Sequence, residues 1–562
     1  MLHKEDKKKV EQIQMIALDQ LVPADHLLRK IDRYVDFDFI YDLVEDLYCP
    51  DNGRPSIDPV VLIKLVFLQH LYGIRSMRQT IKEVEVNLAY RWFLGLDFYD
   101  KIPHFTTFGQ NYRRRFQDTD LFESIFTNIL QQAMDQGFVD TRLQFVDATH
   151  VKAHANRHKN KKAVVKKHVR SYQQQLEKEI ADDRNAHGKD DLKPPKNPPT
   201  DTTTITQSTT DPESGLFHKG EHKEVFAYTI QTACDAHGWI LACQSFPGNR
   251  HDSSTFFDFL PKLQALKPEK LVMDAGYKTP AIAKTLLEKD ILPVFPYTRP
   301  KHKPALDDPY YKRDFVYDAY YNCYLCPEET ILPYSTTTRE GYREYKSNPK
   351  ICKNCPTLHR CTASKNHQKT VTRHLWQDAL DVAEDYRYTT QGKAEYKQRK
   401  ETIERQFGSA KEYHGLRYTN QRGRKKMDLK AVLTFACMNM KKLALMMDRK
   451  ERDGGGDGPS FTDLWRKWID NIKKRQTPRF IRSLSAVWKP PQGLFLVGRI
   501  GCEEKKALTL HDMQEHCNQN EHLSYVQTNQ SVNFGSFRYL QQMIKHNLNQ
   551  SFLIFYYFFD FS

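Results

Sequence analysis

The stretch that decides the fold is residues 143–151, LQFVDATHV. Apolar and polar residues alternate along it, and β-branched and aromatic side chains are frequent, so the stretch predicts a buried strand. Asp147 stands in its middle. A carboxylate is costly to bury unless a partner compensates its charge, and a metal ion is one such partner. Asp147 is therefore the first candidate for an active-site residue.

Two later segments supply further carboxylates. Residues 270–276 (KLVMDAG) predict a short strand that delivers Asp274 to its C-terminal end. Residues 400–411 (KETIERQFGSAK) predict a helix that carries Glu404, with Glu401 as a rival one turn earlier. Hard cations such as Mg²⁺ or Mn²⁺ prefer carboxylate oxygens, and two of them can clamp the attacking and leaving oxygens of a phosphodiester. A two-metal phosphoryl-transfer site is therefore predicted at Asp147, Asp274 and Glu404.

The charge balance indicates a polyanionic partner, nucleic acid first and anionic membrane second. The chain has 562 residues, enough for two to four domains, and 85 Lys and Arg against 70 Asp and Glu give a net charge of +15. A basic but merely soluble surface is the alternative. No signal peptide and no membrane-spanning run is predicted. The 11 cysteines, an odd number, suit a reducing compartment, so we expect a cytoplasmic, nucleoid-associated protein.

Residues 1–135 predict an all-helical N-terminal domain. Asp58 and Pro59 form an N-cap and first-turn pair ahead of a strongly apolar helix. Ser76 and Gln79 predict a capping box that opens the next one. Short turns between helices favour a helix-turn-helix type DNA-binding domain, and a helical packing or oligomerisation domain is the alternative.

Residues 140–448 predict a second domain that begins with the Asp147 strand. An insertion over residues 152–222 follows, with a basic run over 159–170 that grades into a helix and a long exposed loop over 182–215. Because the basic run starts beside the acidic site, we expect it to contact phosphates.

The succession of elements after this insertion predicts the topology. Residues 224–235 and 239–248 predict a hairpin, followed by helix, strand, helix and strand. His251 and Asp252 are expected to cap the first of these helices, and a role in orienting the site is the alternative. Three strands in a meander followed by two parallel crossovers resemble the α/β RNase H-like fold, a mixed five-stranded sheet with helices. In that fold Asp147 and Asp274 would lie side by side.

A second insertion, residues 298–391, is rich in cysteine. Two Cys-x2-Cys pairs and one further cysteine have the spacing of a tetrahedral Zn²⁺ site, with His359 as a possible substitute ligand. Such a structural site would hold together an insertion that otherwise lacks a core. Reduced cysteines and an iron–sulfur cluster are the alternatives. The five residues are Cys323, Cys326, Cys352, Cys355 and Cys361.

The last part of the chain is expected to stand apart. Residues 429–447 predict an apolar helix that closes the catalytic core, and residues 449–460 predict a flexible charged linker. Residues 461–562 form a C-terminal tail to which no function is assigned.

Around the three candidate acids the chain resembles the DDE transposases of bacterial insertion sequences. The resemblance is greatest to the group with a helical N-terminal domain and an RNase H-like catalytic core split by a cysteine-bearing insertion. It extends over roughly residues 1–450, and its motifs occur in the family's order. They are FVDATHVKAHAN around Asp147, STTDPESGLFHKG from Ser208, PGNRHDSSTF from Pro247, MDAGYKTP around Asp274 and IERQFGSAKEYHGLR around Glu404.

The resemblance implies a function and further site residues. It implies that Asp147, Asp274 and Glu404 are catalytic, with Mg²⁺ (or Mn²⁺), in cleavage and strand transfer at transposon ends. It implies a homodimer on DNA, because two ends must be brought together. A non-mobile nuclease of the same fold and a catalytically inactive DNA-binding protein are the alternatives. The residues implied to bind DNA phosphates are Lys411, Tyr396 and Arg399, with Lys400 or Arg405 as alternatives to Arg399.

Overall fold

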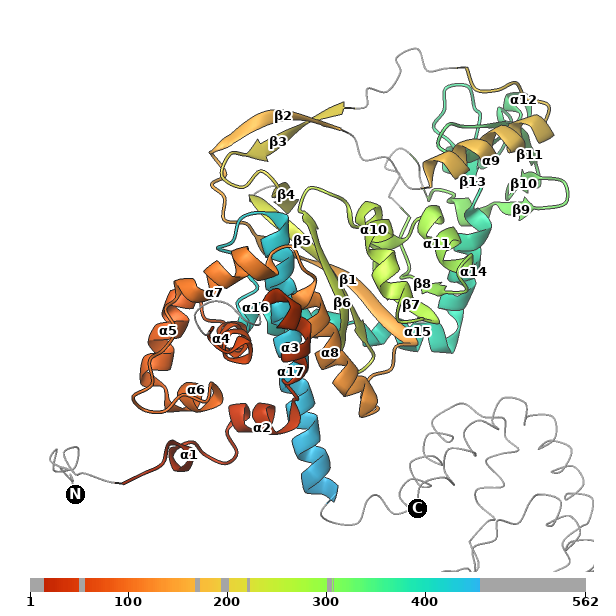
Figure 1. Ribbon diagram of the computed structural model, residues 1–562. Coiled ribbons are helices and arrows are strands. Elements are labelled where there is room, and N and C mark those ends of the chain that lie inside the picture. Colours follow the sequence, from red (N-terminus) through yellow and green to blue (C-terminus); the bar gives the residue numbers. More distant parts are fainter. Residues whose placement is uncertain are drawn as a thin grey trace, which may run out of the picture. The chain divides into compact units, whose positions relative to one another are not determined.

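The computed structural model describes residues 15–49, 56–166, 172–193, 202–219, 223–300, 306 and 308–454. Residues 1–458 belong to one compact unit, shown with its labelled elements in Figure 1. The predicted C-terminal tail, residues 461–562, lies outside the described residues.

A six-stranded mixed sheet carries the candidate acids. Its strand order is β4-β5-β1-β7-β8, and β6 also pairs with β5. β5 is antiparallel to β1, β4 and β6, whereas β1, β7 and β8 are mutually parallel. The predicted mixed sheet with helices is therefore confirmed, but it has six strands instead of the predicted five, because β4 pairs with β5. The strands are β1 (Leu143–Lys152), β4 (Gly215–Lys219), β5 (Lys223–Asp235), β6 (Ile240–Pro247), β7 (Lys270–Met273) and β8 (Leu292–Val294).

Helices cover both faces of this sheet, with α10 and α11 on one side and α17 on the other (Figure 1). α10 packs against β5 and β6, α11 and α14 pack against β8, and α16 packs against β1. The crossovers from β6 to β7 and from β7 to β8 are thus the predicted helices. Their bounds are α10 (Asp252–Gln264), α11 (Pro280–Leu287), α14 (Gln377–Tyr388), α15 (Thr390–Gln398), α16 (Ile403–Glu412) and α17 (Arg424–Gly454).

The N-terminal region is helical across its described part, as predicted. Asp58 caps α4 and Pro59 takes the first helical position. The Ser76 hydroxyl accepts the Gln79 N–H at 3.2 Å, but the Gln79 side chain donates to Glu83, so only half of the capping box forms. The helices are α1 (Leu18–Leu21), α2 (Leu27–Tyr34), α3 (Phe39–Val44), α4 (Pro59–Leu71), α5 (Met77–Val86), α6 (Leu88–Phe93), α7 (Thr106–Asn111) and α8 (Leu121–Asp135).

Helix α17 joins these helices to the sheet. It packs against α2, α4 and α8 and also against β6, and the buried residues of both parts form one apolar core. It extends beyond the predicted apolar stretch, so the first residues of the predicted linker, 449–454, are helical. The extension is stabilised by ion pairs, because Asp448 contacts Lys30 at 2.8 Å and Arg452 at 2.7 Å.

The first insertion differs from the prediction. Within its described part the basic run forms strand β2 (Asn160–Lys166), which pairs with β3 (Thr202–Ser208), whereas residues 167–170 of the run lie outside the described residues. The helix α9 spans Gln173–Ala186. Residues 182–215 therefore contain the end of a helix and strand β3 rather than one long loop. The β-branched residues of TTTIT in β3 favour an extended strand, which outweighs the polar composition on which the loop prediction relied.

The second insertion has a core of its own, contrary to the prediction. Five strands form an antiparallel sheet in the order β13-β12-β11-β10-β9. The strands are β9 (Val316–Asp318), β10 (Cys323–Leu325), β11 (Ile331–Thr337), β12 (Tyr342–Lys346) and β13 (Thr370–His374). Their core side chains are Phe315, Tyr324, Leu332, Tyr345 and Val371.

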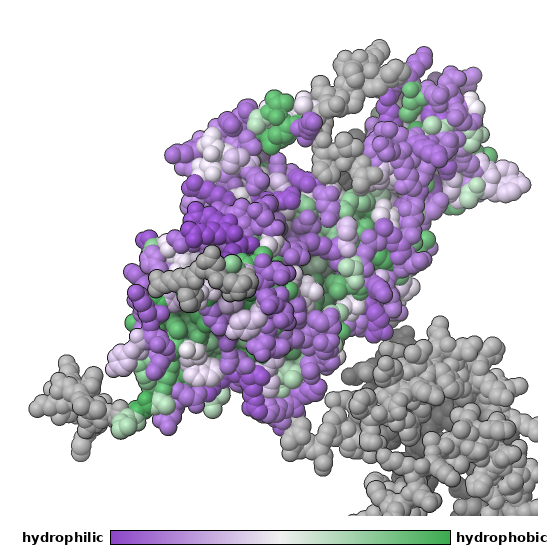
Figure 2. All heavy atoms as spheres, in the orientation of Figure 1, coloured by the Kyte–Doolittle hydropathy of each residue, from purple (hydrophilic) through white to green (hydrophobic). Residues whose placement is uncertain are grey.

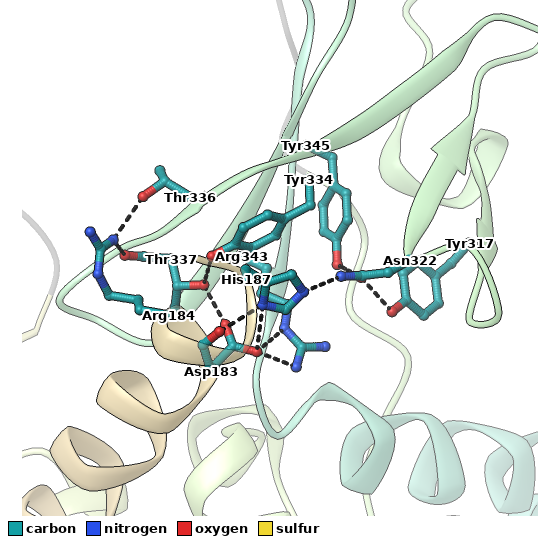
Figure 3. Close-up of polar contacts among 10 residues, drawn as sticks. All are labelled: Asp183, Arg184, His187, Tyr317, Asn322, Tyr334, Thr336, Thr337, Arg343 and Tyr345. Carbon is teal, nitrogen blue, oxygen red and sulfur yellow. Dashed lines mark hydrogen bonds and ion pairs between the residues drawn. The ribbon is translucent and has the colours of Figure 1, made fainter. Parts of the chain in front are cut away.

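A buried carboxylate joins the two insertions, as Figure 3 shows. Asp183 of α9 accepts hydrogen bonds from Arg343 on β12, with Nε at 2.9 Å and Nη2 at 2.5 Å, and from the Thr337 hydroxyl at 2.5 Å. The neighbouring Arg184 donates to the Thr336 hydroxyl at 2.8 Å. Helix α9 is therefore attached to the second sheet, although the two lie far apart in sequence.

The visible face of the described residues is mainly hydrophilic (Figure 2). Within these residues no helix has the length and apolar character needed to cross a membrane.

We expect Asp183→Ala to release α9 from the second sheet. The substitution leaves the half-buried Arg343 guanidinium without its carboxylate, and breaking such a pair costs about 3–5 kcal/mol. Hydrogen exchange should become faster in α9 and β12. Asp182→Ala, which removes an exposed carboxylate from the same helix, is the matched control. Equal exchange in both variants would contradict the assignment.

Candidate active site

The pairing of two strands places Asp147 beside Asp274. β1 and β7 are parallel, and Val146 lies opposite Met273. Each candidate acid is the next residue along its strand direction. Asp274 turns the chain into a short 3-10 helix, its Oδ1 accepting the Gly276 N–H at 2.8 Å. The two carboxylates thus meet at the C-terminal edge of β7.

The Asp147 carboxylate is buried, with 14% of the side chain exposed. Burial raises its pKa to about 6, and the negative charges of Asp274 and Asp252 act in the same direction. Arg399 and the Ala148 N–H, which donates to Oδ1 at 2.8 Å, oppose this rise. The pKa therefore reflects a cluster of acids in a poorly solvated position.

Arg399 connects Asp147 to Glu404. Its Nη2 lies 2.5 Å from Asp147 Oδ2, and its Nη1 lies 2.7 Å from Glu404 Oε1. Arg399 follows the last residue of α15, and Glu404 is in the first turn of α16. The break between the two helices thus turns both side chains toward β1. The rival Glu401 instead lines a separate cleft.

Asp252 is a fourth carboxylate of this cluster, a position for which the sequence favoured helix capping and left a role in orienting the site as the alternative. Its pKa is raised to about 6 by burial and by the charge of Asp274. His251 is the residue that caps α10, its Nδ1 accepting the Ser253 N–H at 3.3 Å. The motif GNRHDSS was a visible signal for this position, but the carboxylate's direction depends on how α10 packs.

Two family models match parts of the chain. Residues 16–114 match the family described as "Transposase domain (DUF772)", and residues 325–444 match the family described as "Transposase DDE domain". Both matched families are transposase families, and the second is a DDE domain. Glu404 lies within the second match, whereas Asp147 and Asp274 lie outside both.

Several solved structures are similar to this chain. No curated protein matches the chain. It is similar to a piggyBac transposase in a synaptic complex with hairpin DNA, with 9% identity, coverage of 88% of this chain and 90% of that one, and a TM-score of 0.31. It is also similar to Mos1 transposase in a paired-end complex with the left transposon end (12% identity, 44% and 61% coverage, TM-score 0.13). A Mos1 mariner paired-end complex with Mn has 13% identity, 47% and 65% coverage and a TM-score of 0.13.

Of the residues predicted to bind DNA phosphates, Tyr396 lies near the acids and Lys411 shares a helix face with Glu404, whereas Arg405 lies in a separate cleft. Tyr396 is half-buried near the acids, and its pKa is raised first by burial and further by the charges of Asp274 and Glu404. Lys411 lies two turns beyond Glu404 on α16, a spacing that keeps both residues on one helix face. Arg405 is exposed in the cleft that also contains Glu401, away from the ion pairs that join Arg399 to the acids.

Four of the five cysteines in the second insertion converge. Cys326, Cys352, Cys355 and Cys361 line one small cavity, which Cys323 on β10 does not join. Burial raises the pKa of the Cys361 thiol, and the other three thiols act in the same direction. The Cys326 sulfur accepts the Thr330 N–H at 3.2 Å. Four of the five predicted zinc ligands therefore lie together, and Cys323 lies apart from them.

The acidic site suits a hard cation chemically. Among the described residues no three His, Cys, Asp or Glu side chains are grouped as the ligands of a metal ion. At the acidic site Arg399 lies between Asp147 and Glu404 and holds their oxygens. The site has more carboxylates than the single Arg399 guanidinium neutralises. Carboxylate oxygens are the ligands that Mg²⁺ and Mn²⁺ prefer.

We expect Asp252→Asn to stabilise the metal-free protein at pH 7.5. Asp147 and Asp252 have raised pKa values, so the folded state binds more protons than the unfolded state between about pH 4 and pH 6. The free energy of unfolding therefore falls as the pH rises through this range. The variant should gain on the order of 1 kcal/mol over the wild type at pH 7.5, and little at pH 4.5.

The measurement is denaturant unfolding in EDTA at both pH values. Asp258→Asn is the control, because it changes a more exposed carboxylate of α10 that faces Arg250. A wild-type protein whose stability rises between pH 4.5 and 7.5 relative to Asp252→Asn would contradict this prediction.

Proposed function

We propose that this transposase cleaves phosphodiester bonds at the ends of an insertion sequence and joins the ends to target DNA with two divalent metal ions. One observation carries the proposal: Asp147 of β1 and Asp274 at the end of β7 lie side by side at one edge of the sheet, and Arg399 links Asp147 to Glu404 of α16. The match to the transposase DDE domain supports the same reaction class. Mg²⁺ or Mn²⁺ is the proposed metal.

The topology supports an RNase H-like catalytic domain. Strands β6, β5 and β1 are antiparallel neighbours, and β7 and β8 extend the sheet in parallel to β1. We therefore propose a helical DNA-binding domain over residues 1–135 and a catalytic domain over residues 140–448. The catalytic domain is interrupted by the insertions 152–222 and 298–391.

Each proposed site residue has a distinct task. Asp147, Asp274 and Glu404 would hold the metal ions, which when bound activate a water or a DNA 3′-hydroxyl and neutralise charge on the phosphate. Asp147 lies within β1, whereas the Glu404 side chain, in the first turn of α16, is 45% exposed. Tyr396, Arg399 and Lys411 would bind phosphates, with Arg399 favoured over Lys400 and Arg405 by its contact with the acids.

The proposed partners follow from charge and from the reaction. A net charge of +15 favours binding to DNA, and a second copy of the chain would hold the second transposon end. We propose a cytoplasmic, nucleoid-associated homodimer on DNA.

We expect Asp147→Ala and Glu404→Gln to abolish cutting and joining of a labelled duplex that carries the DNA flanking the gene. Each change removes a metal-ligating carboxylate, and the expected loss of rate is about 10³-fold or more. Glu401→Gln is the matched control on the same segment and should retain activity. The readout is strand cleavage and joined product in Mg²⁺, with EDTA as the blank.

The outcomes separate the candidate functions. Metal-dependent cutting that shows no preference for the ends and gives no joined product would indicate a non-mobile nuclease instead of a transposase. Duplex binding that persists in EDTA, with neither cutting nor joining by the wild type, would indicate a catalytically inactive DNA-binding protein.

We also propose a structural Zn²⁺ held by Cys326, Cys352, Cys355 and Cys361. Their convergence on one cavity supports it, as does the N–H donated to the Cys326 sulfur, since such hydrogen bonds stabilise thiolate ligands. Cys323 is left out of this set, because it is buried in β10 and does not line the cavity.

We expect purified protein to contain about one zinc per chain. Cys326→Ser should lose the metal and lower the melting temperature of the second sheet, whereas Cys323→Ser should keep the metal. Elemental analysis together with thermal unfolding measures both. Wild-type protein without zinc, or equal zinc loss in the two variants, would contradict this ligand set.

A further inference from the structure

The Arg399 guanidinium lies where a divalent cation would bind the acids. We propose that Arg399 is an internal counter-cation that blocks the metal site in the free protein and moves to a DNA phosphate when metal and DNA bind. This inference rests on the proposed function. It gives Arg399 the role of coupling metal binding to DNA binding.

The contacts of Arg399 and of a metal ion exclude each other. One guanidinium donates to Asp147 Oδ2 at 2.5 Å and to Glu404 Oε1 at 2.7 Å, so it links two of the three acids. A divalent ion takes carboxylate oxygens at about 2.0–2.6 Å and requires the same lone pairs. A guanidinium in this position would also repel the ion. The acids therefore accept one cation or the other.

The Arg399 ion pair is well protected from water. The side chains of Arg399 and Asp147 are 12% and 14% exposed, so water screens their attraction only weakly. Separating them in the free protein would leave Asp147 uncompensated beside Asp274 and Asp252, which is strongly unfavourable. Metal entry is thus opposed unless both members of the ion pair gain a new partner. The metal ion would replace Arg399 as the partner of Asp147, and a DNA phosphate would replace Asp147 as the partner of Arg399.

Arg399 also has unused hydrogen-bonding capacity. Its Nε is buried and has no partner among the described residues, so the guanidinium is not fully satisfied where it lies. The planar fork of arginine matches the oxygens of a phosphate. The residue stands between α15 and α16 and belongs to neither helix.

The test measures Mn²⁺ binding to the full-length protein without DNA. Electron paramagnetic resonance reports the concentration of free Mn²⁺ during the titration. Arg399→Gln should bind Mn²⁺ roughly tenfold more tightly than the wild type, because the competing cation is gone. Arg399→Lys should be intermediate, since an ammonium matches two carboxylates less well. Arg405→Gln, an exposed arginine in another cleft, is the control and should bind like the wild type.

A second arm adds a duplex that carries the flanking DNA. The duplex should raise the Mn²⁺ affinity of the wild type and have little effect on Arg399→Gln. Melting in EDTA should show a lower temperature for Arg399→Gln, with recovery on adding Mn²⁺. Arg399→Lys keeps the test valid if Arg399→Gln does not fold.

The results distinguish this inference from the proposed function. Equal or weaker Mn²⁺ binding by the Arg399 variants would overturn the counter-cation role and identify a purely structural ion pair. Mn²⁺ binding that is the same in wild type and Asp147→Asn, with and without DNA, would instead overturn the proposed metal site.

Discussion

The parallel pairing of β1 with β7 is the constraint on which the acidic site depends. Strand register fixes which residues are neighbours, and a shift by one residue would turn every side chain to the opposite face. With Val146 opposite Met273, the next residue on each strand is an aspartate. The site is therefore only as well defined as this pairing. Buried apolar residues on both strands, Phe145, Val146, Leu271 and Val272, hold the register.

This arrangement places like charges together in a region of low polarity. Burial raises the pKa values of Asp147 and Asp252, and the negative charge of Asp274 acts on both in the same direction. Arg399 offsets only part of this charge. A fold that concentrates negative charge beyond what its own cations neutralise retains a strong attraction for added cations. Stability and metal recruitment are thus in opposition at this site, a relation typical of functional positions.

Sequence periodicity was sufficient for those elements whose partners are adjacent or whose pattern is strong. The central strand with Asp147, the hairpin at His237 and the capped helix α4 follow from local signals. The pairing of β2 with β3 did not, because a helix lies between the two strands in sequence and most of their residues are polar and exposed. Arg399 was identified by resemblance as a phosphate-binding candidate, but its contact with two acids depends on the break between α15 and α16. For Asp252 a role at the site was only the second interpretation, because a capping position explains the same local sequence.

Helix α16 is held at both ends, which connects the acidic site to the helical region. Near its first turn Glu404 contacts Arg399, and shortly beyond its last residue His414 is buried and hydrogen-bonds through Nδ1 to the His70 carbonyl at 3.0 Å. His70 belongs to α4 and its ring hydrogen-bonds to Thr434 of α17 at 3.3 Å. A displacement of α4 must therefore break buried hydrogen bonds or carry α16 with it. The region that matches the transposase domain and the helix that carries Glu404 are thus positioned by packing rather than by a flexible linker.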